Sequence, residues 1–132
     1  MKLWIILCLL TFFSVRAYSQ DAGKVRFNET TWNIIVSQYN PNIEKLYCLY
    51  WHREQDIAYV DSVELIGTGN RLSITKITKE CDNPTLHTHP PEYPDFDGND
   101  YMMMFNSKMP FFCLMTADKQ LKYWPSDPFS DK

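Results

Sequence analysis

The chain has 132 residues, a length that fits a single domain. It contains 13 lysine and arginine residues against 16 aspartate and glutamate residues, which gives a formal net charge of −3. An acidic chain argues against nucleic acid as the main partner, and no internal repeat or low-complexity tract interrupts it.

The first twenty residues have the pattern of a secretory signal peptide. Lys2 gives a positive start, a mostly apolar run follows over 3–15, and small residues alternate in Ala17-Tyr18-Ser19. The run is short for a bilayer span, although a retained membrane anchor is the alternative. We therefore expect a signal peptide over 1–20, a mature domain over 21–132, a secreted or periplasmic location, and no stable membrane anchor after cleavage. The mature part has 11 basic and 16 acidic residues, a net charge of −5.

The first expected elements are a helix and a hairpin. Residues 21–27 are short and polar, which favours an irregular lead-in. A helix is predicted over 31–39, because apolar residues recur there at helical spacing: Trp32, Ile35, Val36 and Tyr39. The aromatic and apolar run 44–51 predicts a buried strand, and 57–66 predicts a second strand that pairs back on it. Gly67-Thr68-Gly69-Asn70 has the composition of a turn.

The second half alternates strands and a helix. We expect strands over 72–77 and around the histidines at 85–89, then a helix at about 99–107. Its Met102-Met103-Met104 run is expected to form one face of a core helix with the odd methionine exposed, and a methionine-rich binding surface is the alternative. Strands are predicted over 111–116 and 121–124, followed by a frayed tail over 125–132. This order predicts the α/β class: a single small domain with a mixed sheet flanked by helices.

Three cysteines lie in the mature part: Cys48, Cys81 and Cys113. An odd number leaves at least one thiol free or paired between chains. Cys48 and Cys113 lie in apolar runs typical of central strands, so we expect both to be small core residues. A bridge between these two is the alternative.

Two of the three histidines stand two residues apart, at His87 and His89. On a strand, residues i and i+2 point to the same face, so both imidazoles can converge on one point. Asp100 begins an apolar helical run, and a carboxylate on the first helical turn can reach the end of the preceding strand. Two imidazoles and one carboxylate are the ligands of a catalytic zinc site. The alternative is two half-buried strand histidines and an aspartate favoured by the helix dipole.

These residues also carry a resemblance to a known family. His87-Thr88-His89-Pro90, six intervening residues and then Asp97-Gly98-Asn99-Asp100 resemble the signature of the JAMM/MPN zinc metalloproteases, in the spacing of the prokaryotic, RadC-like branch. The resemblance covers about residues 31–124. It implies a JAMM/MPN-like fold of cytidine-deaminase-like layout, a bound Zn²⁺ held by His87, His89 and Asp100, and a peptide or protein as substrate.

The resemblance also implies a catalytic carboxylate on an early strand. Its position in this chain is Glu44, with Glu64 as the second choice. Such a group takes a proton from the attacking water and delivers it to the leaving amine. The alternative for Glu44 is a solvated residue at the start of a strand.

Asp97 departs from the family pattern, which has serine at this position. A hydroxyl can donate a hydrogen bond to a developing oxyanion, whereas an ionised carboxylate can only accept one. Three alternatives follow. Asp97 is protonated and acts as the donor, or Asn99 or a water acts as the donor in its place. Otherwise the domain is catalytically degenerate and binds a protein partner. A helix N-cap is the structural alternative for Asp97. A further alternative is a non-enzymatic secreted domain in which the histidines are merely packed.

Overall fold

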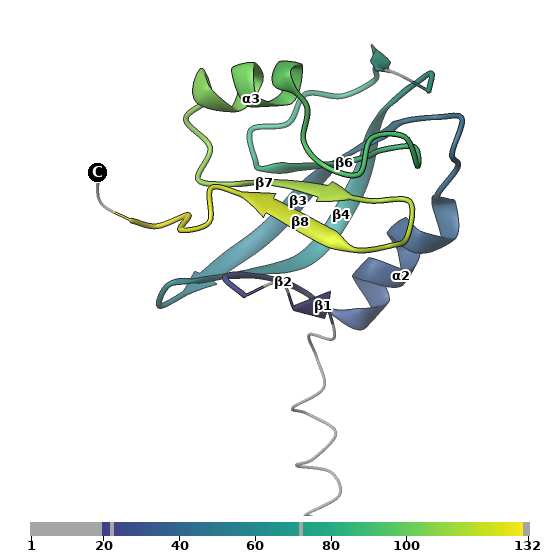
Figure 1. Ribbon diagram of the computed structural model, residues 1–132. Helices are drawn as coiled ribbons and strands as arrows, with labels where there is room; N and C mark the ends of the chain where they lie inside the picture. The colour runs from purple at the N-terminus through teal and green to yellow at the C-terminus, as the bar shows by residue number, and fades with distance from the viewer. Residues whose placement is uncertain (1–19, 22, 72, 131–132) are drawn as a thin grey trace, which may run out of the picture.

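The computed structural model describes residues 20–21, 23–71 and 73–130 (Figure 1). The signal peptide expected over 1–20 lies outside these residues, except for Gln20. Within the described residues, neither helix is long and apolar enough to cross a membrane.

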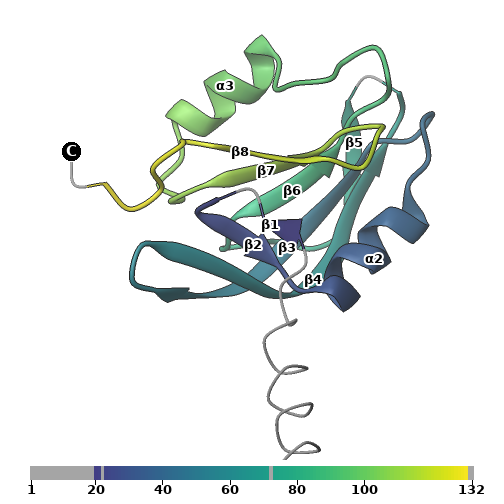
Figure 2. The same ribbon diagram turned by 60° about the horizontal axis from the view of Figure 1, so that its bottom comes forward.

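The domain is a small α/β unit built on one mixed sheet that curves strongly, so that it is nearly barrel-like (Figures 1 and 2). The strand order is β1-β2-β4-β3-β6-β7-β8, and β5 pairs with β4 outside this path. The pairs β2–β4 and β6–β7 are parallel, and the others are antiparallel. The described strands are β1 (Gln20–Asp21), β2 (Val25–Phe27), β3 (Lys45–Glu54), β4 (Ile57–Gly69), β5 (Ile74–Ile77), β6 (Thr85–Thr88), β7 (Phe112–Met115) and β8 (Leu121–Trp124).

The β3–β4 hairpin confirms the predicted strand pair, with Glu54 opposite Ile57 next to the turn. The turn predicted over 67–70 is wrong for its first three residues, because β4 continues through Gly69 and pairs there with β5. Glycine permits this close approach of two backbones. A Cβ atom at Gly69 would lie 1.8 Å from the carbonyl oxygen of Ser73.

The two helices cover different parts of the sheet. Helix α2 (Glu29–Gln38) begins earlier than predicted because Asn28 is its N-cap and accepts a 2.7 Å hydrogen bond from the Thr31 amide. Trp32 and Ile35 anchor it in the main core. Helix α3 (Gly98–Phe105) lies over a smaller cluster formed by Phe96, Met104 and Leu114.

Two expectations about the ends of the domain are wrong. The lead-in over 21–27 is not irregular, because β2 pairs with β4 and buries Val25 and Phe27 completely. The alternation of these apolar residues with Arg26 is the strand pattern that the short length concealed. At the other end, the part of the tail that is described folds back, and the ring of Phe129 stacks on Trp51 with 5.8 Å between centroids.

The methionine run is also placed differently from the expectation. Only Met104 is buried, whereas Met102 and Met103 are 66% and 73% exposed. Two of the three methionines are therefore exposed, one more than expected, and helix α3 presents an apolar surface to solvent.

The cysteines pair in a way that the sequence did not predict. Cys48 of β3 forms a disulfide with Cys81, whereas Cys113 is free and buried. The alternative Cys48–Cys113 bridge is excluded by the strand order, since β6 lies between β3 and β7. Two strand spacings of about 4.8 Å each exceed the Cα separation that a disulfide permits.

Removal of this disulfide is expected to lower the free energy of unfolding by about 3–4 kcal/mol, because the bond closes a long loop in the unfolded chain. The bridged residues are 33 positions apart. Urea unfolding of a Cys48→Ser/Cys81→Ser double variant measures the loss. Reductant should destabilise the original protein equally and leave the double variant unchanged. Equal unfolding midpoints for the original protein with and without reductant would contradict the assignment.

Candidate metal centre

Strand β6 carries His87 in the interior of the sheet, and His89 follows directly after its end. His87 pairs with Leu46 of β3 on one side and Leu114 of β7 on the other, and the His89 amide donates to the Met115 carbonyl at 3.2 Å. The two rings converge as predicted, with their Nε2 atoms 3.0 Å apart. Neighbouring strands on both sides therefore fix the backbone that carries the pair.

Asp100 closes the group from the first turn of α3. Its Oδ1 lies 3.3 Å from Nε2 of His87, and its Oδ2 lies 3.3 Å from Nε2 of His89. Burial alone would raise the pKa of the Asp100 carboxyl, but hydrogen bonds to both histidines outweigh it and hold that pKa well below its usual range. One donor atom from each of these three residues lies within 4.8 Å of the others, a group that can hold a metal ion.

The backbone around His89 orients its ring. Nδ1 of His89 lies 3.0 Å from the carbonyl oxygen of Tyr93, which can only accept, so Nδ1 carries the proton. Nε2 is then the nitrogen that would bind a metal ion, in place of its hydrogen bond to the Asp100 carboxylate. The Tyr39 hydroxyl donates to the His89 carbonyl at 2.9 Å and ties the end of this segment to the region after α2.

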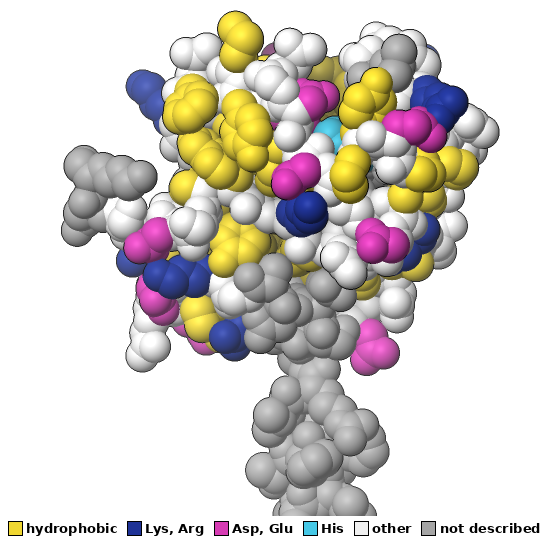
Figure 3. Space-filling view, in the orientation of Figure 1, with side chains coloured by type: hydrophobic (Ala, Val, Ile, Leu, Met, Phe, Trp, Pro, Cys, Tyr) yellow, Lys and Arg dark blue, Asp and Glu magenta, His cyan; other side chains and the backbone are white. Residues whose placement is uncertain are grey.

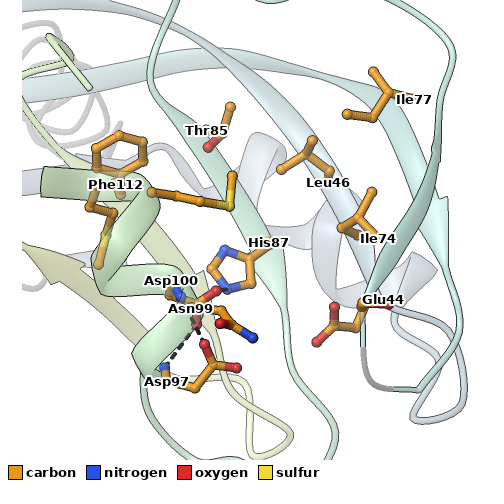
Figure 4. A pocket seen from close by; sticks show the side chains of 13 residues that line it. Glu44, Leu46, Ile74, Ile77, Thr85, His87, Asp97, Asn99, Asp100 and Phe112 are labelled. Atoms are coloured by element: carbon orange, nitrogen blue, oxygen red, sulfur yellow. Dashed lines mark hydrogen bonds and ion pairs between the residues drawn. The ribbon is translucent and has the colours of Figure 1, made fainter. Parts of the chain in front are cut away.

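Glu44 lies immediately before β3 and lines a pocket that His87 and Asp100 also line (Figure 4). It is only 7% exposed, and its Oε1 lies 3.8 Å from Nε2 of His89. Burial raises the pKa of its carboxyl, against the opposing effect of His89 and His87. The backbone is held by two hydrogen bonds, from Glu44 to the Asn70 carbonyl and from the Gly69 amide to the Glu44 carbonyl. The solvated alternative for Glu44 is therefore wrong.

Glu64, the second choice for the catalytic carboxylate, lies elsewhere. Its carboxylate is 3.0 Å from the Lys79 ammonium and accepts a 2.8 Å hydrogen bond from the Tyr50 hydroxyl. It does not line the pocket that contains Glu44 and His87. These surface partners lower the pKa of the Glu64 carboxyl, with Lys79 the larger influence.

Asp97 is the N-cap of α3 and also lines the pocket. Its Oδ1 accepts the Asp100 amide at 2.8 Å, and its own amide donates to Asp100 Oδ2 at 2.9 Å. This reciprocal capping box fixes the Asp100 carboxylate that meets the histidines. The N-cap alternative for Asp97 is confirmed, and Asn99 lines the same pocket with an amide that can donate.

Loss of this cap is expected to reduce stability by about 1 kcal/mol in an Asp97→Ala variant, whereas Asp97→Ser should remain within a few tenths of the original protein. Serine keeps an oxygen that can accept the Asp100 amide, and alanine does not. Urea unfolding of the metal-free proteins measures both changes. Equal destabilisation by both substitutions would show that the cap is not the role of this side chain.

The pocket has a volume of about 280 Å³ and is lined by His87. Part of its wall is apolar and was not predicted, because these strand residues resemble core positions in the sequence: Leu46, Ile74, Ile77 and Phe112. No sequence signal distinguishes them, since β5 and α3 reach the site only through the folded sheet. The carbonyl of Tyr93 and the hydroxyl of Tyr39 were missed for the same reason.

Comparisons of the chain with protein-family models, with curated proteins and with solved structures found no match. The function must therefore be argued from the residues of the site. They form a partly buried group of two imidazoles and one carboxylate that can hold a metal ion, with a second carboxylate beside it.

Proposed function

We propose that this protein is an exported zinc-dependent peptidase or isopeptidase of the JAMM/MPN type. The observation that carries the proposal is the convergence of His87, His89 and Asp100, with Glu44 buried at their edge. Two imidazoles and one carboxylate leave a fourth position open on a tetrahedral zinc ion, as catalytic sites require. The donor set suits zinc better than calcium or magnesium, which prefer oxygen ligands.

The order of the elements around the site supports the JAMM/MPN layout. A carboxylate precedes the β3–β4 hairpin, His87 lies on β6 with His89 directly after it, and the aspartate lies on α3, followed by the β7–β8 pair. The family signature has the same order: a carboxylate on an early strand, then the histidine segment, then the aspartate segment. The resemblance covers residues 31–124.

The chain's own residues supply the remaining chemistry. Zinc, when bound, lowers the pKa of water toward neutrality. Glu44 would accept the proton of the attacking water and return it to the leaving amine. Its burial favours this role, because a raised carboxyl pKa brings the base closer to neutral pH. Asn99 would donate to the developing oxyanion in place of the family's serine.

A second candidate function rests on Asp97. Its carboxylate stands where the family has a hydroxyl donor and is engaged as a cap. A degenerate domain that keeps the metal group and binds a protein partner would have this feature. In that case the zinc-loaded protein binds a peptide without cleaving it.

An exported location has independent support. A disulfide between Cys48 and Cys81 is characteristic of oxidising compartments, and the signal-like segment over 1–20 agrees with it. The net charge of −5 for residues 21–132 favours peptides and proteins over nucleic acids as partners.

The test is hydrolysis of a peptide pool by protein produced from the full-length sequence. The pool should contain linear and isopeptide-linked members, with products identified by mass spectrometry. We expect cleavage that stops with a chelator and returns with zinc. A zinc-loaded protein that cleaves no member would reject the peptidase and leave the binding domain.

A further inference from the structure

The pocket beside the metal group has two chemically different ends (Figure 4). Leu46, Ile74 and Ile77 lie on one side of His87, and Asp97 lies on the opposite side, below Asp100. Met103, Met104 and Phe112 complete the apolar wall. A ligand that spans the pocket past His87 therefore meets hydrocarbon at one end, with the Glu44 carboxylate beside Ile74, and the Asp97 carboxylate at the other end.

The charge of the lining is one-sided. Among the described residues it contains three carboxylates, from Glu44, Asp97 and Asp100, and no lysine or arginine. Asp97 uses Oδ1 as the helix cap and has a second carboxylate oxygen for another donor. At the end formed by Asp97, an acidic ligand would be repelled and a basic side chain would be attracted.

The size and surroundings of the pocket restrict the occupant further. A volume of about 280 Å³ lies just below the range of roughly 300–1,000 Å³ typical of small-ligand sites, so it fits a short extended segment. Two of its apolar lining side chains are also largely exposed, Ile77 at 65% and Met103 at 73%. Figure 3 shows hydrophobic side chains gathered over α3, with acidic side chains and a histidine beside them. Such a contiguous exposed patch favours apolar ligands.

We infer that the pocket binds an extended peptide with a bulky apolar residue on one side of the bond presented to His87, His89 and Asp100, and a basic residue on the other. The apolar side chain occupies the wall formed by β3, β5 and α3. The basic side chain pairs with Asp97. This inference rests on the proposed function for the statement that the presented bond is the one cleaved. The binding preference can be measured separately.

Four fluorescent peptides of equal length test the preference. They share a Gly/Ser background and differ in the central pair: Leu-Lys, Lys-Leu, Gly-Lys and Leu-Asp. Binding is measured by fluorescence polarisation to the zinc-loaded, full-length Glu44→Gln variant, and cleavage by mass spectrometry with the original protein. We expect Leu-Lys or Lys-Leu to bind at least about tenfold more tightly than Gly-Lys and Leu-Asp.

Paired variants locate the apolar contact. Ile77→Gln/Met103→Gln should weaken binding of the preferred peptide at least about tenfold, because both side chains line the pocket. Leu65→Gln/Met102→Gln is the matched control. It also alters two exposed apolar residues, but outside the lining, and should change binding less than about twofold.

The outcomes separate the inference from the proposed function. The expected preference with cleavage supports both. The same preference without cleavage supports the inference and rejects hydrolysis. Equal binding and cleavage of all four peptides overturns the inference and leaves the peptidase intact. Binding of none of them, or equal weakening by both double variants, also overturns it.

Discussion

Replacement of both histidines in His87→Ala/His89→Ala is expected to reduce bound zinc from about one ion per chain to less than about a tenth. The two imidazoles supply two of the three donor atoms that lie within 4.8 Å of one another. Asp100 alone would supply one carboxylate, which is too few ligands to hold zinc tightly. Plasma mass spectrometry on untagged protein, after incubation with zinc and removal of the excess, measures the content.

His52 provides a matched control for this variant. It is the third histidine of the chain and lies on β3, but its ring pairs with Asp61 at 2.6 Å and stacks on Tyr59. A His52→Ala variant should therefore retain the full zinc content. Absence of zinc from the original protein, or equal loss in both variants, would contradict the assigned centre.

Zinc binding is also expected to change the stability of these proteins. A ligand present at 100 times its Kd stabilises the folded state by about 2.7 kcal/mol. Zinc should therefore raise the unfolding midpoint of the original protein and of His52→Ala, and leave the double histidine variant unchanged. This readout separates a specific site from metal adsorbed to surface carboxylates.

Glu44→Gln is expected to keep zinc and to reduce hydrolysis by about 10²- to 10⁴-fold. Glutamine preserves the shape of the side chain beside His89 but cannot accept and return a proton. The measurement is the rate of cleavage of a peptide identified in the pool experiment, together with the zinc content of the same sample. Loss of both would indicate a structural defect instead of a lost base.

Glu64→Gln is the corresponding control. It makes the same chemical change on β4, where the carboxylate contacts Lys79 and Tyr50 outside the pocket. Its cleavage rate should remain within about twofold of the original, as expected for a surface substitution. A larger loss in Glu64→Gln than in Glu44→Gln would reverse the assignment of the two carboxylates.

Local patterns in the sequence determined much of this protein. The two-residue period of a strand was sufficient to predict that His87 and His89 converge, because it needs no knowledge of other elements. The β3–β4 hairpin and helix α2 followed from apolar spacing, with errors confined mostly to their ends. The N-cap role of Asp97 was likewise available from the residue type and the helix that follows it.

Only the tertiary structure decided which distant residues meet. Glu44 and Glu64 are both upstream carboxylates near strands, and the curvature and pairing of the sheet bring only Glu44 to His89. The order β3-β6-β7 separates Cys48 from Cys113, which left Cys81 as its partner. These outcomes depend on how strands far apart in sequence lie beside one another, which short-range periodicity does not encode.

The apolar surface next to the site is the clearest case of this division. Met103 of α3 and Ile74 of β5 look like core residues in the sequence, yet they line an accessible pocket with His87. Hydrophobicity predicts that a side chain favours burial. Whether the chain itself has an element to cover that side chain depends on the packing of the whole domain, and here that packing leaves Met103 largely exposed.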